Sequence, residues 1–188
     1  MFGSFNPIHV GHLIIGQYMA TRTDCTEVHF IVSPHNPLKR PAGLADARHR
    51  LQMVRLAVRR NPLLIADPVE FGLSRPSYTI DTLEYLAQRH PRHQYRLIIG
   101  SDNLAIFTKW KRWEDVLDQF GCYVYLRSGH DPGKLGQHPA VTICDAPFLD
   151  ISATYIRACL REKRSIRYLV PDNVLRYLHQ HAVFDFLR

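Results

Sequence analysis

Cysteine and long apolar runs are both scarce in this 188-residue chain. Its four cysteines form no Cys-x-x-Cys pair, which argues against a disulfide scaffold and against a zinc ribbon. The longest aliphatic runs fall far short of the roughly 20 residues that cross a bilayer, and the N-terminus has no basic segment followed by an apolar core. These absences predict a cytoplasmic protein with reduced thiols.

The chain also lacks an acidic excess, since 24 Lys and Arg oppose 17 Asp and Glu and give a formal net charge of +7. A basic balance favours anionic partners, namely nucleic acid, an anionic membrane or phosphorylated small molecules, and charge alone does not choose among them. With 46% hydrophobic and 22% charged residues, the composition is that of a folded protein. No linker rich in proline, glycine or serine divides the chain, so we expect a single domain over 1–188.

Short β-branched runs alternate with stretches of helical period, which predicts a Rossmann-like α/β fold with an open, mostly parallel sheet and helices on both faces. Strands are expected at 28–33, 63–66, 95–100, 122–127 and 141–144. Helices are expected at 11–22, 46–60, 79–90, 112–120, 153–163 and 172–181. The helical part from about 152 is expected to pack on the rest of the domain, and Pro171 suits the start of the final helix.

Two local expectations accompany this fold. Only Met1 and Phe2 precede the first turn, so the first strand is expected to be truncated, either because native residues are missing before Met1 or because the sheet has a stub there. In the helix at 46–60 the apolar residues form one broad face. Five arginines are expected to project away from that face: Arg48, Arg50, Arg55, Arg59 and Arg60.

The N-terminal segment Gly3-Ser4-Phe5-Asn6-Pro7-Ile8-His9-Val10-Gly11-His12 stands where a strand end meets a helix start, and open α/β sheets bind ligands there. Backbone N–H groups in such a turn can hold an anion, and Gly3 leaves room for phosphate oxygens. His9 and His12 are three residues apart, so both can face one phosphate. Two structural histidines or a metal pair are the alternatives, but no third zinc ligand stands at a plausible spacing. Phosphate binding is the favoured interpretation.

A second candidate anion site stands at the start of the helix expected at 153–163. Ser152 is a good N-cap, which is its simplest interpretation. Ser152, Thr154 and Arg157 also bring two hydroxyls and a forked cation to a helix N-terminus. The motif is weak evidence by itself and strong evidence in combination with the N-terminal segment.

These two motifs together resemble those of the nucleotidyltransferase superfamily that moves AMP from ATP onto a phosphate. Within it, the sequence is similar along nearly its whole length to the bacterial nicotinate-nucleotide adenylyltransferases. Three middle segments carry that similarity: 77–83 (SYTIDTL), 99–103 (IGSDN) and 109–113 (KWKRW). The related pantetheine-phosphate adenylyltransferases share both end motifs but are shorter and lack these middle segments.

The resemblance implies transfer of AMP from ATP to nicotinate mononucleotide, with Mg²⁺ accompanying ATP and no metal site in the protein. The implied catalytic residues are His12, His9 and Arg157. The residues implied to bind ATP are Gly3, Ser4, Phe5, His9, His12, Lys39, Asp102, Ser152, Thr154 and Arg157. Those implied to bind nicotinate mononucleotide are Ser4, Thr79, Asp102 and Trp110, with Trp110 stacked on the pyridine ring. Lys39 follows Asn36-Pro37-Leu38 where the family has Pro-Pro-His, so the roles of His35 and Lys39 stay open.

The middle segments also have simpler interpretations. Ser77 or Thr79 can cap a helix, Asp102 can brace a turn, and Trp110 and Trp113 can be core anchors or a stacking platform for single-stranded nucleic acid. Two other functions therefore stay open, namely adenylyl transfer to phosphopantetheine or a flavin mononucleotide, and a basic nucleic-acid-binding module. The preferred prediction has neither a nucleic-acid nor a membrane partner. The sequence leaves the choice of nicotinate over nicotinamide, the metal preference and a homo-oligomeric state open.

Overall fold

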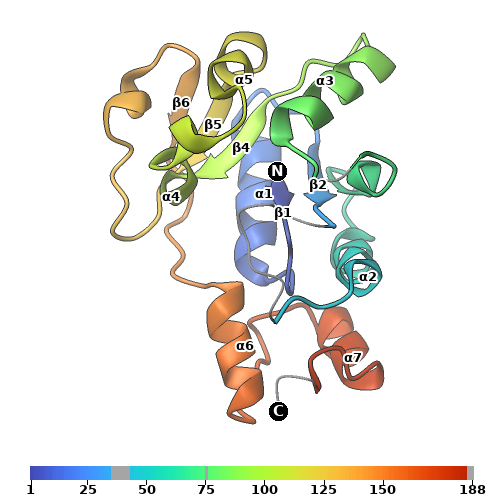
Figure 1. Ribbon diagram of the computed structural model, residues 1–188. Helices are drawn as coiled ribbons and strands as arrows, with labels where there is room; N and C mark the ends of the chain where they lie inside the picture. The colour runs from blue at the N-terminus through green and yellow to red at the C-terminus, as the bar shows by residue number, and fades with distance from the viewer. Residues whose placement is uncertain (35–42, 75, 186–188) are drawn as a thin grey trace. The chain divides into compact units, whose positions relative to one another are not determined.

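The computed structural model describes residues 1–34, 43–74 and 76–185. The chain divides into two compact units, and Figure 1 traces the elements of both. Unit 1 consists of Met1–Phe2 and Leu73–Asp150, and unit 2 consists of Gly3–Gly72 and Ile151–Arg188.

Unit 2 is built on a three-stranded sheet with the order β1-β2-β3. β1 (Phe2–Gly3) spans the boundary between the units, and β2 (Val28–Val32) pairs in parallel with β3 (Leu64–Asp67). Four of the five residues of β2 are buried, which is typical of a strand covered on both faces. The helices of this unit are α1 (Val10–Arg22), α2 (Ala47–Val58), the 3₁₀ helix η1 (Val69–Phe71), α6 (Ala153–Arg161) and α7 (Asp172–Gln180).

Unit 1 contains a second three-stranded sheet, in which β4 (Leu97–Gly100), β5 (Cys122–Tyr125) and β6 (Val141–Cys144) lie parallel in chain order. The core of this unit gathers residues of the sheet, of α3 and of the segment after β4, among them Leu97, Ile80 and Phe107. The helices are α3 (Thr79–Arg89), α4 (Ser101–Leu104), η2 (Phe107–Lys109), α5 (Trp113–Gln119) and η3 (Lys134–Gln137).

The predicted α/β class is confirmed, and each expected strand and helix is present with small shifts of its ends. The first strand is only two residues long, as predicted, and the final helix begins directly after Pro171. Where one open sheet was expected, the strands form two three-stranded sheets. The short elements α4, η1, η2 and η3 were not predicted because three or four residues are too few to show a helical period.

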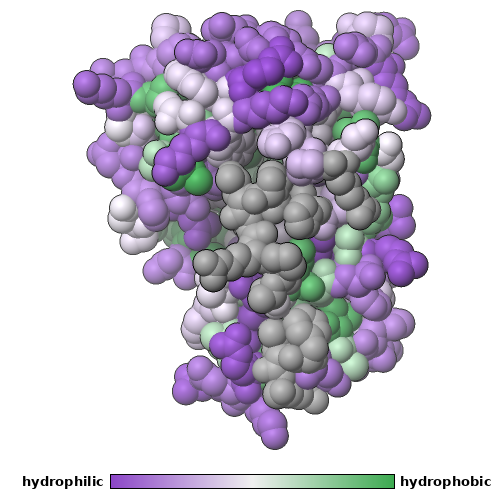
Figure 2. Space-filling model, in the orientation of Figure 1, coloured by the Kyte–Doolittle hydropathy of each residue, from purple (hydrophilic) through white to green (hydrophobic). Residues whose placement is uncertain are grey.

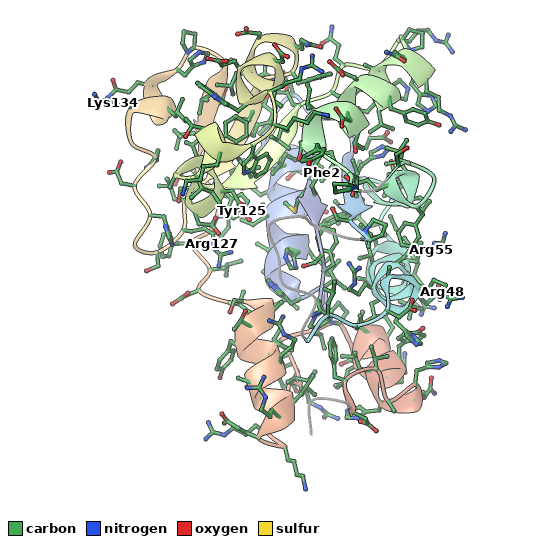
Figure 3. The ribbon with its side chains drawn as sticks, in the orientation of Figure 1. Phe2, Arg48, Arg55, Tyr125, Arg127 and Lys134 are labelled. Carbon is green, nitrogen blue, oxygen red and sulfur yellow. The ribbon has the colours of Figure 1, made fainter. Side chains whose placement is uncertain are left out.

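One side-chain prediction is wrong. Arg48, Arg55, Arg59 and Arg60 are exposed, and Figure 3 shows Arg48 and Arg55 pointing away from α2. Arg50, in contrast, has an exposed fraction of 0%. It packs inside unit 2 because backbone carbonyls accept its hydrogen bonds, which offsets the cost of burying the charge.

Two expectations came from the scarcity of cysteine and of long apolar runs, namely that no disulfide forms and that no helix crosses a membrane. The four cysteines are all free, so no disulfide forms among them. Within the described ranges, no helix has the length and apolarity needed to cross a bilayer.

Candidate active site

The turn after β1 is built around the buried ring of Phe5. Phe5 has a φ of +44°, in the left-handed region that large side chains rarely adopt. Its side chain is only 2% exposed, and its ring meets those of Phe30 and His12 at centroid distances of 5.7 and 5.1 Å. A Cβ atom on Gly3 would lie 2.9 Å from the same ring, so glycine is required above it. Packing therefore holds a strained backbone in place, as is common at ligand-binding turns.

His9 and His12 are brought together at the start of α1. His9 is the N-cap residue, and its backbone N–H donates to Nδ1 of His12 at 3.3 Å. The two rings stack with centroids 3.7 Å apart. Because Nδ1 of His12 accepts a hydrogen bond, the neutral ring carries its proton on Nε2. His12 is thus set up as a hydrogen-bond donor at Nε2, the atom that a phosphate oxygen would need.

Gly11 lies where the two motifs from opposite ends of the chain meet. A Cβ atom at this position would lie 2.5 Å from Cγ2 of Ile151. Ile151 directly precedes Ser152, the N-cap of α6. The glycine in the His-x-Gly-His segment therefore allows the start of α6 to approach the start of α1.

Arg157 joins the same two motifs by hydrogen bonds. One NH1 hydrogen is donated to the backbone oxygen of Asn6 at 2.8 Å, and one NH2 hydrogen to Oγ1 of Thr154 at 3.2 Å. Burial lowers the pKa of Arg157, and the neighbouring Arg161 lowers it further. A bound anion would offset both effects, because it would interact favourably with the guanidinium charge.

Ser152 has the capping role that its position suggests. Its Oγ accepts a hydrogen bond from the backbone N–H of Tyr155 at 3.1 Å, which satisfies one donor of the first turn of α6. The hydroxyl proton remains a donor in chemical terms, so capping and anion binding are compatible.

In unit 1, Asp102 lies in α4, directly after β4. Its Oδ1 is 4.0 Å from Nε of Arg127, and the backbone N–H of Arg127 donates to Oγ of Ser101 at 2.9 Å. A Cβ atom on Gly100 would lie 2.3 Å from Oδ1 of Asp102, so the carboxylate folds back over the backbone of Gly100. Asp102 braces the strand end and also presents a carboxylate there.

Figure 3 shows Tyr125 and Arg127 close together at the end of β5. Burial raises the pKa of Tyr125, while the charge of Arg127 acts in the opposite direction. Arg127 is a candidate site residue that sequence reasoning missed. The position of Arg127 just after a buried parallel strand could have indicated this role, because binding side chains are commonly found there.

The simpler role of helix cap does not hold for Thr79, whereas the simpler role of core anchor holds for Trp110. Thr79 is the first residue of α3, and the N-cap is Tyr78, so Thr79 does not cap the helix. Trp110 packs against the core of unit 1, with its ring 5.0 Å from that of Phe107. Its indole Nε1 is buried and has no hydrogen-bond partner among the described residues. Trp110 is therefore a core anchor whose polar atom is left unsatisfied.

Two of the three cations in the KWKRW segment are paired. Lys111 binds Asp81 at 2.8 Å, and Arg112 binds Glu84 at 2.8 Å and also Asp115. These pairs connect the beginning of α5 to α3, and Figure 2 shows a largely hydrophilic surface over α5. Carboxylates thus engage two of the three cations of the KWKRW segment, which weakens the nucleic-acid interpretation.

No group of three or more His, Cys, Asp or Glu side chains within the described ranges could hold a metal ion. The side chains beside the turn after β1 are imidazoles, hydroxyls and a guanidinium, whereas Mg²⁺ prefers carboxylate, carbonyl and water oxygens. This donor set suits a phosphate better than a resident metal.

The structure thus brings one subset of the expected site residues together in unit 2. This subset comprises Gly3, Ser4, Phe5, His9, His12, Ser152, Thr154 and Arg157. Thr79, Asp102 and Trp110 belong to unit 1. Lys39 and His35 lie outside the described residues.

The family model described as cytidylyltransferase-like matches residues 1–159. The chain belongs to this family. A relative of this cytidylyltransferase-like chain in Cytophaga hutchinsonii, named probable nicotinate-nucleotide adenylyltransferase, is 49% identical over 173 residues, 92% of this chain and 90% of the relative. Another of the same name in Flavobacterium johnsoniae is 42% identical over 185 residues, 97% of this chain and 96% of the relative. The resemblance drawn from the motifs is therefore confirmed.

Solved structures support the fold of this cytidylyltransferase-like chain. A Plasmodium falciparum nicotinic acid mononucleotide adenylyltransferase complexed with NaAD matches with a TM-score of 0.82 and 18% identity, and covers 98% of this chain and 95% of that one. The same enzyme complexed with APC matches with a TM-score of 0.81. At this identity the likeness shows the shared α/β fold.

Proposed function

We propose that this chain is a nicotinate-nucleotide adenylyltransferase, which transfers AMP from ATP to nicotinate mononucleotide and releases pyrophosphate in NAD biosynthesis. The observation that carries the proposal is the meeting of the His9 and His12 pair with Arg157 around the strained turn at Phe5. These groups are donors to anions, and the curated relatives are named for this activity.

Adenylyl transfer requires the side chains only to position the two substrates and to stabilise charge. An oxygen of the mononucleotide phosphate, already ionised at neutral pH, forms a bond to the α-phosphorus of ATP. The bond from that phosphorus to the bridging oxygen breaks, and its electron pair leaves with pyrophosphate. No general base is needed, so alignment of two anions and stabilisation of the growing charge supply the catalysis.

His12 is assigned to the α-phosphoryl group, because its Nε2–H is the donor fixed by the bond from His9. Arg157, Thr154 and Ser152 are assigned to the β and γ phosphates that leave. We assign the Gly3 to Phe5 backbone to the ATP phosphates as well, and Lys39 keeps the ATP-binding role that the resemblance implies.

Nicotinate mononucleotide is assigned to Ser4 and to three residues of unit 1. Thr79 at the first turn of α3 is assigned to the nicotinate carboxylate, and Asp102 to the nucleotide ribose. Trp110 is assigned to the pyridine ring, and its unsatisfied indole N–H supports a polar ligand there, since buried donors without partners are rare in folded proteins.

Mg²⁺ enters as part of the substrate, Mg·ATP, because the donors beside the turn do not suit a resident Mg²⁺ ion. Its charge would neutralise the phosphates, while the residues named above orient them. We further propose that residues 1–188 function as a single nucleotidyltransferase domain in the cytoplasm, in which α6 and α7 are an integral part.

A coupled assay of pyrophosphate release, run with ATP and a panel of acceptors, tests the function. The panel contains nicotinate mononucleotide, nicotinamide mononucleotide, phosphopantetheine and a flavin mononucleotide, with an acceptor-free control. We expect rapid release with nicotinate mononucleotide and formation of nicotinate adenine dinucleotide on chromatography. Faster turnover of another acceptor would reassign the substrate, and no release with any acceptor would refute an adenylyltransferase.

A further inference from the structure

Arg50 is a fully buried cation on α2 that none of the assigned roles uses. Its guanidinium donates four hydrogen bonds, all to backbone oxygens. The acceptors are Ser4 at 2.7 Å, Ser33 at 2.8 Å, Pro34 at 2.8 Å and Ala45 at 3.0 Å. A guanidinium has five N–H groups in a rigid plane, so four carbonyls nearly exhaust its capacity.

These four carbonyls come from three separate stretches of chain. Ser4 belongs to the turn after β1, Ser33 and Pro34 follow β2, and Ala45 precedes α2. The same NH1 nitrogen binds both Ser4 and Ser33, while the backbone N–H of Ser33 donates to Gly3 at 2.9 Å. Arg50 therefore joins the turn to the end of β2 through a short hydrogen-bond network.

Asn6 provides a second link between the turn and the stretch before α2. Its Nδ2 donates to the backbone oxygen of Gly43 at 2.8 Å, and its Oδ1 accepts from the N–H of Ala45 at 3.1 Å. Asn6 is 4% exposed, and its own backbone oxygen accepts the bond from Arg157. The turn is thus held by hydrogen bonds from Arg50, from the side chain of Asn6 and from Arg157.

The charge of Arg50 is also unusual, because it is fully buried without an ion-pair partner among the described residues. Burial lowers its pKa to about 10, with Asp46 acting in the opposite direction, so the guanidinium stays positive at neutral pH. Among the ion pairs of the described residues, none involves Arg50. A buried cation held by carbonyl dipoles and by the field of Asp46 is costly, and an anion bound close by would offset part of that cost.

We infer that Arg50 is a positioning residue for nucleotide phosphates, which holds the Ser4 carbonyl inward so that the Gly3 to Phe5 backbone keeps the conformation that receives them. The inference rests on the proposed assignment of that backbone to ATP. Arg50 does not touch the substrate in this role, and it acts through the turn.

Arg50→Lys tests the inference, with Arg48→Lys as the matched control on the same helix. Lysine keeps the charge but cannot reach four carbonyls in a plane. The side chain of Arg48 is 88% exposed, so its replacement should change nothing. We expect folded Arg50→Lys to lose about 100-fold in kcat, the effect of displacing a reacting group, and about tenfold in ATP and pyrophosphate affinity by calorimetry. Folded Arg50→Lys with wild-type ATP and pyrophosphate affinity would overturn the inference, because a purely structural role changes the melting temperature alone.

A measurement on the unchanged protein covers the case in which Arg50→Lys fails to fold. The Nε–H of Arg50, which donates to Ala45, is followed by NMR while ATP is added to saturation. We expect its resonance to shift because the turn it holds receives the phosphates. A resonance that does not move would overturn the inference.

The wild-type protein separates this inference from the proposed function. If it binds ATP and pyrophosphate but adenylylates no mononucleotide, the function fails, and the affinities of Arg50→Lys still decide the role of Arg50. If it binds neither ATP nor pyrophosphate, the inference about Arg50 is overturned as well.

Discussion

Arg157 donates a 2.8 Å hydrogen bond to the backbone oxygen of Asn6, across 151 positions of the sequence. The bond connects the helix that begins at Ala153 with the segment between the strained Phe5 and the histidine pair. A cation that helps to shape the turn and also faces the leaving phosphates would couple substrate binding to the conformation of the turn.

Arg157→Lys should raise the KM for ATP by about tenfold, because a lysine cannot hold Asn6 and a phosphate at once as a planar fork can. Steady-state kinetics with nicotinate mononucleotide at saturation measures the change. Arg161→Lys, an exposed arginine of the same helix, is the control and should behave as the wild type. Equal effects of the two substitutions would contradict a specific role for Arg157.

His12→Ala should lower kcat by about 100- to 1,000-fold, the usual effect of removing one donor to developing charge. The side chain is half-buried at the start of α1, so the fold should survive, which circular dichroism can check. Replacement of the exposed His179 by alanine is the control. Near-normal adenylyl transfer by His12→Ala would refute the assignment.

The sequence predicted the fold well because strand and helix periodicity is local information. The motif at 3–12 and the Ser152 to Arg157 motif were found from residue types that bind anions, and the structure brings them together in unit 2. Arg50 was placed on the wrong side of α2 because arginine is usually exposed, although its spacing from the buried Met53 and Val54 matched the core face. Its carbonyl partners come from three stretches of chain, and no local pattern encodes such a network.

Trp110→Phe should raise the KM for nicotinate mononucleotide more than the KM for ATP. Phenylalanine keeps much of the packing on Phe107 but removes the buried indole N–H and narrows the ring available for stacking. Trp113→Phe is the matched control, because the ring of Trp113 also packs against Phe107. If both KM values rise equally in Trp110→Phe, the residue is a core anchor without a part in binding.

The hydrogen-bonded pair of His29 and Asp67 makes the free energy of unfolding of unit 2 depend on pH. The hydrogen bond with Asp67 raises the pKa of His29 above 6.5, despite burial, and Glu27 adds to the effect. Burial acts to raise the pKa of Asp67, but the hydrogen bonds from His29 and Val69 outweigh it and lower this pKa below 3.8. The His29 contribution is therefore fully present below pH 6.5 and is lost as the pH rises through its folded pKa. The Asp67 contribution is present above pH 3.8 and is lost as the pH falls through its folded pKa.

His29→Gln should accordingly lower the melting temperature more at mildly acidic pH than at alkaline pH. Scanning calorimetry of wild type and variant over that range measures the difference. His179→Gln, an exposed histidine without such partners in the described contacts, should show no comparable trend. A destabilisation by His29→Gln that is equal at all pH values would contradict the linkage.

Gly11→Ala tests whether the two end motifs must touch. The added Cβ would lie 2.5 Å from Cγ2 of Ile151, so Ile151 must shift, and a displacement of the start of α6 would carry Arg157 with it. We expect a loss of activity of about 100-fold, the scale seen when a catalytic group is displaced. Ile151→Ala removes the clashing methyl, so the double variant should recover part of this loss, and the coupling is read from a double-mutant cycle. Gly72→Ala is the control, because its nearest neighbouring atom is 3.8 Å away. Additive effects of Gly11→Ala and Ile151→Ala would show that the contact does not transmit the position of α6 to the site.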